Sequence, residues 1–368
     1  MAVIIIPIVV WFLTWLQRLI YQKFWSKNLD ASVKFSDRYM IAGEETEVVE
    51  TMTNAKILPL PWVHMKFEIF RNGKTDNQFR NDLFNILFHQ QIVRKSKLKL
   101  ERRGVYQIKK INLLSYDLFI SKKLYRNYDN QATITVYPQG VSGDDIQVPY
   151  EKLMGEIATR RYTLEDPFLF KGIREYQPED SFRNINFKAS ARNNRWLVNT
   201  HEYTLDQKVR IVLLTDKTYA YSEEEEYEAG LRYAAELANR LEQDGVPVEL
   251  WSNGLDSLEG TEPRLKEGCS SQHTEAILEA LARLDIQVTG TPGEQLIRQL
   301  SDEREADEYY VIICPDHSKR LVEAYQQLRN YTDACMYISP VNYHGLLAMP
   351  QEEKRLADTV ENFFFFKL

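Results

Sequence analysis

The sequence predicts an α+β protein built from a transmembrane helix, a β-sandwich-like module and an α/β module with a mainly parallel sheet. Three observations favour this fold class: an apolar N-terminal stretch, a series of short alternating segments after it, and a C-terminal part in which apolar strands alternate with amphipathic helices. A chain of 368 residues has room for two or three domains. The predicted boundaries are 1–27 for the anchor, 28–140 for the β module, 141–205 for a connector and 206–368 for the α/β module.

The first predicted element is a membrane-spanning helix. Residues 2–16 are apolar apart from one threonine, and with Arg18 snorkelling, residues 2–21 reach the roughly 20 positions that cross about 30 Å of hydrocarbon. A cleaved signal peptide is the alternative, but it needs a positive charge before the apolar run, and none is present. Arg18, Lys23 and Lys27 follow the run, so the positive-inside rule predicts a cell-membrane protein with most of the chain in the cytoplasm.

The second predicted element is an all-β module. Its segments alternate apolar and polar residues, and turn signals such as Ala42-Gly43 and Asn72-Gly73 separate them. Short strands at this spacing, without a long helical pattern, are typical of a sandwich. The predicted strands are residues 31–35, 46–52, 62–70, 91–99, 104–114 and 133–137.

The third predicted element is an α/β module. Strands that are hydrophobic throughout indicate a parallel sheet covered by helices on both faces. Ligands bind outside the carboxyl ends of such strands, which places the expected binding edge at residues 215–222 and 315–318. The predicted strands are 209–214, 246–251, 309–314 and 334–338, and the predicted helices are 223–243, 273–284 and 319–330.

The composition excludes several classes of function. The net charge is −7 and charges of both signs are mixed along the chain, so the basic face of a nucleic-acid-binding protein is missing. The three cysteines have no CxxC spacing, which favours inert thiols in a reducing compartment. The six histidines lack zinc-site spacing, and no nucleotide-binding or nucleophile-elbow motif is present. The sequence therefore predicts that the protein is not an enzyme and has no nucleic-acid partner.

Residues 172–202 hold the densest combination of charged and apolar side chains in the chain. Single arginines and carboxylates alternate with aromatic and aliphatic residues, which indicates a partly buried ion-pair platform rather than a solvated charged face. Two interpretations stay open. An enzyme of unrecognised type would direct these arginines and Asp180 into an open pocket, whereas a structural hub between the two modules would pair them with one another.

The same segment resembles the bacterial domain-of-unknown-function 58 family, whose pattern is G-x-R-x-Y-x-x-G-D-x-x-R-x-I-x-W-x-x-S-A-R. The chain departs from it at Glu179 and Phe187, where the family has glycine and tryptophan. Residues 54–62, 102–119 and 136–138 match three further family stretches in order. The motif positions that carry the resemblance, and that form the predicted hub, are Gly172, Arg174, Tyr176, Asp180, Arg183, Ser190 and Arg192.

The resemblance implies a function as well as a fold. Members of the family carry membrane segments and a C-terminal module similar to the von Willebrand factor A fold, and they are encoded beside MoxR-type AAA+ ATPases. It therefore implies a membrane-anchored scaffold or protein-interaction component that works with such an ATPase and with other membrane proteins.

The von Willebrand-like fold implies a second possible function, a metal-dependent adhesion-type site that binds a ligand. Mg²⁺ takes hydroxyl and carboxylate oxygens in octahedral geometry. The corresponding positions here are Asp216, Thr218, Thr274 and Asp316. Ala220 cannot supply the expected third hydroxyl, and Lys217 adds a positive charge beside the site. Without a metal, Asp216 and Thr218 are expected to cap the helix that follows.

Overall fold

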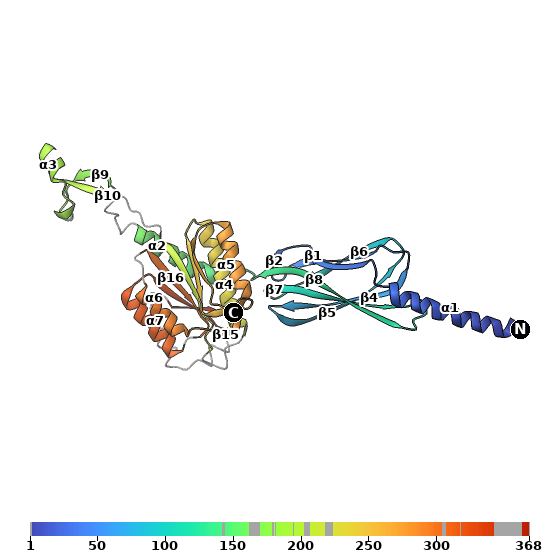
Figure 1. The fold of residues 1–368 in the computed structure, drawn as a ribbon. Coiled ribbons are helices and arrows are strands. Elements are labelled where there is room, and N and C mark those ends of the chain that lie inside the picture. The colour runs from blue at the N-terminus through green and yellow to red at the C-terminus, as the bar shows by residue number, and fades with distance from the viewer. Residues whose placement is uncertain are drawn as a thin grey trace. The chain divides into compact units, whose positions relative to one another are not determined.

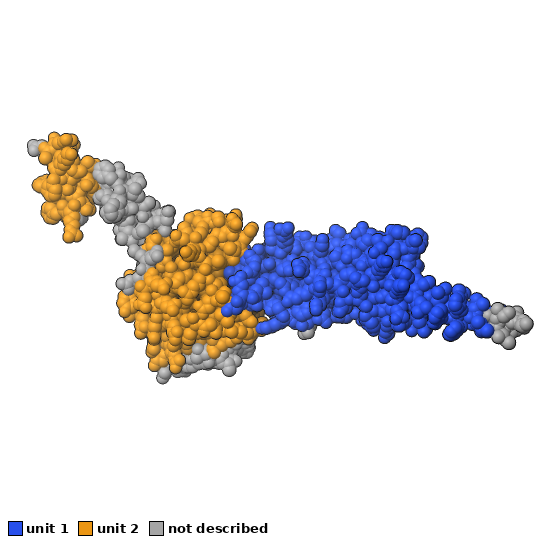
Figure 2. All heavy atoms as spheres, viewed as in Figure 1, with its two compact units in different colours: residues 1–139, 256–260, 278–284 blue, residues 140–255, 261–277, 285–368 orange. Residues whose placement is uncertain are grey.

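In the computed structural model the chain forms two compact units (Figures 1 and 2). Unit 1 comprises residues 1–139, 256–260 and 278–284, and unit 2 comprises the remainder. The structure describes residues 2–141, 144–161, 170–178, 180, 182–193, 195–201, 207–217, 224–303, 307–316, 318–341 and 363–367.

Unit 1 begins with helix α1 (Ala2–Phe24), and this helix corrects the predicted membrane anchor. No helix in the described part of the chain is long and apolar enough to cross a membrane. The last two turns of α1 are bound to the β module instead: Gln17 Nε2 donates to Asp117 (2.9 Å), and Tyr21, 1% exposed, donates its hydroxyl to Pro59 O (2.8 Å). The remaining 15 residues before Gln17 span only about 22 Å. The predicted transmembrane element, and the fold class that includes it, are therefore wrong.

Two mainly antiparallel sheets make up residues 29–137 of unit 1. One has the strand order β1-β3-β6, and the other has the order β2-β8-β7-β4-β5 with a parallel β2–β8 pair. Val33 and Val48 from the first sheet share one buried cluster with Phe67, Ile108 and Ile134 from the second. The strands are β1 (Leu29–Phe35), β2 (Tyr39–Ile41), β3 (Glu45–Asn54), β4 (Leu60–Arg71), β5 (Lys74–Ile86), β6 (Gln90–Lys99), β7 (Gly104–Tyr116) and β8 (Lys123–Tyr137).

One buried arginine of unit 1 belongs to the RRGxY stretch that supports the family resemblance. Arg103 is 5% exposed and its Nη1 donates to the carbonyls of Leu281 (2.7 Å), Leu284 (2.9 Å) and Ala282 (3.2 Å), all of which also belong to unit 1. Leu281 and Ala282 lie in the last turn of helix α5 (Ser271–Arg283), and Leu284 directly follows it. The arginine therefore satisfies backbone acceptors that a helix C-terminus leaves without partners.

Unit 2 contains a six-stranded sheet with the order β14-β12-β11-β16-β17-β18. All neighbouring pairs are parallel except β12–β14 at one edge. A short β13–β15 pair lies apart from it. The strands are β11 (Lys208–Leu213), β12 (Val248–Ser252), β13 (Gly254–Asp256), β14 (Arg264–Gly268), β15 (Leu284–Thr289), β16 (Glu308–Ile313), β17 (Cys335–Val341) and β18 (Phe363–Lys367).

Helices cover both faces of this sheet because its strands are apolar on both sides. Helices α6 and α7 bury Leu296 and Tyr325 against Val212 on one face. Helix α4 covers the other face, where Gly230 lies so close to the sheet that a Cβ would come within 3.3 Å of Ile313. The helices are α2 (Asp144–Arg161), α4 (Glu224–Gln243), α6 (Gly293–Asp302) and α7 (Lys319–Tyr331).

A buried ion network joins three neighbouring strands of the sheet. Arg210 of β11 donates to Glu249 of β12 (2.8 Å) and to Glu308 of β16 (2.6 Å). Its guanidinium also lies over the Trp251 ring, 4.2 Å from the centroid. Arg210 and Glu308 are 5% and 2% exposed, so the network stabilises the sheet only while each charge keeps its partners.

The predicted connector contains α2 and a small separate β element. Strand β9 (Phe170–Glu175) pairs antiparallel with β10 (Leu197–His201). Between them lie the 3₁₀ helix η1 (Phe182–Asn184) and helix α3 (Phe187–Asn193). We call β9, η1, α3 and β10 together the motif hairpin. Across the described residues the fold is thus mixed α/β, with seven α-helices and strands in several sheets.

Candidate functional site

Most of the residues that the sequence singled out lie in two regions: the carboxyl edge of the unit 2 sheet and the motif hairpin. At the sheet edge, β11 runs parallel to both β12 and β16, so the residues that follow these three strands meet on one side. These are Asp216 after β11, Asn253 after β12 and Asp316 after β16. The sequence predicted the two aspartates, but not the asparagine.

Asp216 is bound by nitrogen donors on both carboxylate oxygens. Oδ1 accepts from the Gly293 N–H (2.9 Å), and Oδ2 accepts from Asn253 Nδ2 (2.6 Å). Burial raises the pKa of Asp216, and these two hydrogen bonds oppose that shift. Since Gly293 is the first residue of α6, the carboxylate caps this helix and faces the positive end of its dipole.

Asn253 forms hydrogen bonds with two loops of this edge, the one after β11 and the one before α6. Its Oδ1 accepts from the Thr215 N–H (2.8 Å), and its Nδ2 also donates to Thr291 O (2.9 Å). The Thr289 hydroxyl donates to Thr215 O (2.9 Å). The edge is therefore a hydrogen-bonded network that extends from β11 to the start of α6.

Asp316 is fully buried, and its Oδ1 accepts from the Ser318 N–H (2.9 Å) just before α7. Both aspartates lie close enough to Cys314 to influence its thiol. Burial is the main cause that raises the Cys314 pKa well above its ordinary value, and Asp316 and Asp216 add to it. The thiol is thus kept protonated, as expected of an inert core cysteine.

The other two predicted metal ligands do not join this arrangement. Thr274 lies in α5, where its hydroxyl donates to the carbonyl of Ser270, the residue just before the helix (3.4 Å). Thr218 lies outside the described residues. Lys217 does not pair with Asp216, because its ammonium contacts Gln287 Oε1 (3.1 Å) and the Tyr227 ring. In the described part of the chain, no three histidine, cysteine or acidic side chains are placed to hold a metal ion.

Sequence reasoning missed Thr289 and Gly293 because β15 and α6 were not predicted, and it missed Asn253 although the strand before it was predicted at 246–251. The Thr-Gly-Thr-Pro-Gly stretch at 289–293 was the available signal. A proline followed by a glycine at a turn suits the beginning of a helix, where a backbone N–H is free to donate. A Cβ at Gly293 would collide with the Asp216 carboxylate, so this approach requires glycine.

The motif hairpin has a dense set of internal polar contacts. Asn186 caps α3 by accepting from the Ala189 N–H (2.9 Å). The buried Ser190 hydroxyl donates to Asn186 O (2.8 Å) and accepts from the Leu197 N–H (2.9 Å), which ties α3 to β10. The family residue Ser190 therefore holds the helix against the strand.

Two ion pairs lie within the hairpin, one of them between motif residues. Arg174 makes a bidentate contact with Asp180, 2.6 Å for Nη1 to Oδ2, and Arg195 pairs with Glu175. The hydrogen bond from Arg174 is the main cause that lowers the Asp180 pKa. The Arg174 side chain is 45% exposed, so the pairs lie at the surface rather than in the partly buried platform that was expected. A two-stranded element has little interior in which to bury them.

The remaining motif residues take surface or strand positions. Gly172 pairs with Thr200 across the hairpin, and the Tyr176 ring lies 5.9 Å from that of Phe182. Arg183 lies in η1 and Arg192 in the last turn of α3, and both are exposed.

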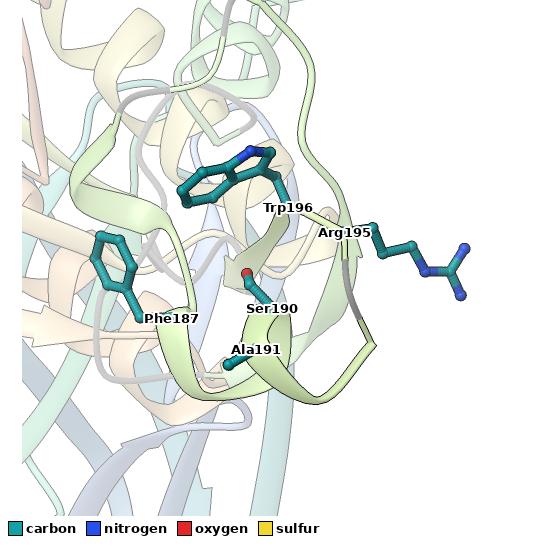
Figure 3. Close-up of a pocket in the computed structure, with 5 residues that line it drawn as sticks. All are labelled: Phe187, Ser190, Ala191, Arg195 and Trp196. Carbon is teal, nitrogen blue, oxygen red and sulfur yellow. The ribbon is translucent and has the colours of Figure 1, made fainter.

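Aromatic side chains form a shallow pocket on the motif hairpin (Figure 3). Its volume is about 390 Å³, and its lining includes Phe187, Ser190, Ala191, Arg195 and Trp196. The Phe187 and Trp196 rings meet edge to face, 6.4 Å between centroids, above Ser190 and Ala191, while the Arg195 side chain extends away (Figure 3). Phe187 and Trp196 are 67% and 59% exposed. Large aromatic rings held open to solvent in this way are typical of a binding surface.

Comparisons with known proteins identify no family. No family model matches the chain, and no curated protein matches it. One similar solved structure is the CARDB domain of the PF1109 protein from Pyrococcus furiosus, 17% identical over 30% of this chain and 93% of that one, with a TM-score of 0.21. Another is a non-cellulosomal cohesin from the archaeon Archaeoglobus fulgidus, 10% identical over 32% of this chain and 96% of that one, with a TM-score of 0.21. Similarities this weak carry no argument about the fold or function of this chain.

Proposed function

We propose that the chain is a protein-interaction component that binds a protein partner through the aromatic surface of the motif hairpin. The observation that supports this most directly is the exposed group Phe182, Phe187 and Trp196, of which each side chain is more than half exposed. Aromatic residues beside arginine are the composition that protein interfaces concentrate at their centres. The internal hydrogen bonds of Asn186 and Ser190 support a surface that is ordered before a partner binds.

The pairing of the motif charges supports an interaction surface over an enzyme. Arg174 binds both carboxylate oxygens of Asp180, and neither residue is among the described residues that line the pocket. The described lining of that pocket is aromatic and small apolar residues with Ser190 and Arg195. The Ser190 hydroxyl already donates to a backbone carbonyl and accepts from a backbone N–H, so it serves the fold.

The partner that we propose is a MoxR-type AAA+ ATPase, which is the partner implied by the resemblance of the motif residues to the domain-of-unknown-function 58 family. The test is equilibrium binding of the full chain to the purified ATPase of this type from the same genome. Phe187→Ala is expected to weaken binding by about 30-fold, the effect of losing a central aromatic contact worth about 2 kcal/mol.

The matched control is Phe79→Ala, which removes a phenylalanine of similar exposure, 56%, from strand β5. This variant is expected to bind like the unaltered chain. Equal losses in the two variants would point to a nonspecific hydrophobic effect. Absence of binding by the unaltered chain would remove the ATPase as the partner.

A further inference from the structure

A second, unrelated cavity lies in unit 1, where the end of α1 meets the loop between β3 and β4. Its volume is about 280 Å³, close to the lower limit of small-molecule pockets, which is about 300 Å³. The apolar part of its wall consists of Ile20 and Phe24 from α1 and Leu58 from the loop. The polar part consists of Lys27, Asn28 and Lys56.

The walls of this cavity are fixed by hydrogen bonds. Asn54, fully buried, donates through Nδ2 to Leu58 O (2.9 Å) and Leu87 O (2.8 Å). The Tyr21 hydroxyl donates to Pro59 O (2.8 Å), which holds α1 against the same loop. Because both sides are held in place, a ligand has to order little of the cavity beyond the Lys56 side chain, which must turn its buried ammonium toward the ligand.

Lys56 is the unusual residue of the cavity. Its Nζ atom is buried, and in the described part of the chain it has no hydrogen-bond partner. An ammonium group without a counterion or acceptor in an apolar setting is costly. Burial alone lowers the Lys56 pKa to about 8, and no carboxylate opposes the shift.

The other charged groups of the cavity are cationic. Lys27 lines the rim, and Lys23 lies over the Phe24 ring, 5.5 Å from its centroid. From the turn between β5 and β6, the titratable residue against this loop is His89, whose backbone N–H donates to Lys56 O (3.2 Å). The cavity therefore offers positive charge at its polar end and hydrocarbon along its walls.

We infer that this cavity binds an alkyl carboxylate, with the carboxylate at Lys56 and Lys27 and the alkyl chain against Ile20, Phe24 and Leu58. The carboxylate supplies the missing counterion and hydrogen-bond acceptor of Lys56. The alkyl chain covers apolar surface that a small inorganic anion would leave in water. Both halves of the ligand are needed, because the carboxylate contacts the polar part of the cavity wall and the alkyl chain contacts the apolar part.

The test is calorimetric titration of the full chain at pH 7 with three probes, with decanoate kept below its micelle-forming concentration and decanol below its solubility limit. Decanoate carries both halves of the predicted ligand, decanol lacks the charge and acetate lacks the chain. Decanoate is expected to bind at least tenfold more tightly than either of the others. Equal binding of decanol would show that Lys56 plays no part, and equal binding of acetate would show a simple anion site; either result overturns the inference.

The decisive variant is Lys56→Met, which keeps an unbranched side chain only one atom shorter and removes its charge. Decanoate affinity is expected to fall at least tenfold, while the melting temperature stays the same or rises because a buried unpaired charge is lost. Lys34→Met is the matched control, since Lys34 is an exposed lysine of β1 in the same unit. A variant that melts normally and still binds decanoate like the unaltered chain would contradict the site.

The pH dependence gives an independent readout. Only protonated Lys56 attracts the carboxylate, so affinity is expected to fall by about tenfold per pH unit above pH 8, with proton uptake on binding. Proton uptake is measured by repeating the titration at pH 9, where free Lys56 is mostly deprotonated, in buffers of different ionisation enthalpy. Lys56→Met should abolish it, and unchanged uptake in that variant would assign the proton to another group.

Discussion

Removal of the Glu308 charge is expected to destabilise unit 2 strongly. Glu308 is 2% exposed and accepts from Arg210 Nη2 (2.6 Å), Lys208 Nζ (3.0 Å) and the Tyr310 hydroxyl (2.7 Å). Glu308→Gln keeps the volume but leaves two cations without their shared counterion. Breaking a buried ion pair from one side costs about 3–5 kcal/mol. For a domain of this size, that corresponds to a fall in melting temperature of between about 6 and 20 °C.

The assay is urea unfolding followed by tryptophan fluorescence, which senses the Trp251 ring stacked on Arg210. Glu267→Gln is the control, because Glu267 pairs with the same Lys208 at 3.0 Å but is 57% exposed. An exposed pair contributes about 0–1 kcal/mol. If Glu308→Gln cost no more than Glu267→Gln, the reasoning from burial would be refuted.

Two further predictions concern the buried carboxylate of unit 1 and the cap of α6. Burial and the nearby Asp82 raise the pKa of Glu50 from 4.5 to about 7, so the folded state holds a proton that the unfolded state has lost, and stability should fall as pH rises from about 4.5 to about 7. Glu50→Gln should flatten this decline in melting temperature, and an unchanged pH profile would assign it elsewhere. Gly293→Ala should cost about 1–3 kcal/mol in urea unfolding, because its Cβ meets Asp216. Gly155→Ala, whose Cβ meets open space in α2, should instead stabilise by about 0.5–1 kcal/mol, and equal effects of the two would contradict the close approach.

Long, strongly periodic elements were accessible from the sequence. The apolar run at 209–214 corresponds to β11, and the helical pattern at 223–243 corresponds to α4. Strand β5 was not predicted because it is polar along much of its length. It forms through backbone pairing with β4, and residue patterns do not record such pairing.

The error at the N-terminus has a similar origin. Hydropathy depends only on residue types. Whether α1 packs on the β module depends instead on contacts such as that of Gln17 with Asp117, which lies 100 positions later in the chain. The residues at the carboxyl edge of the unit 2 sheet were also only partly predictable from the sequence. The two aspartates were visible at strand ends, whereas Asn253 and Gly293 joined them only because β12 and the start of α6 lie beside β11 in space.

The most direct test of the proposed function is hydrogen–deuterium exchange of the full chain with and without the purified MoxR-type ATPase. The motif hairpin is expected to gain protection in peptides covering α3 and β10, where Phe187 and Trp196 lie. Exchange in strand β5, which carries the control residue Phe79, should not change. Protection confined to other parts of the chain, with the motif hairpin unaffected, would contradict the assignment of this surface as the partner-binding site.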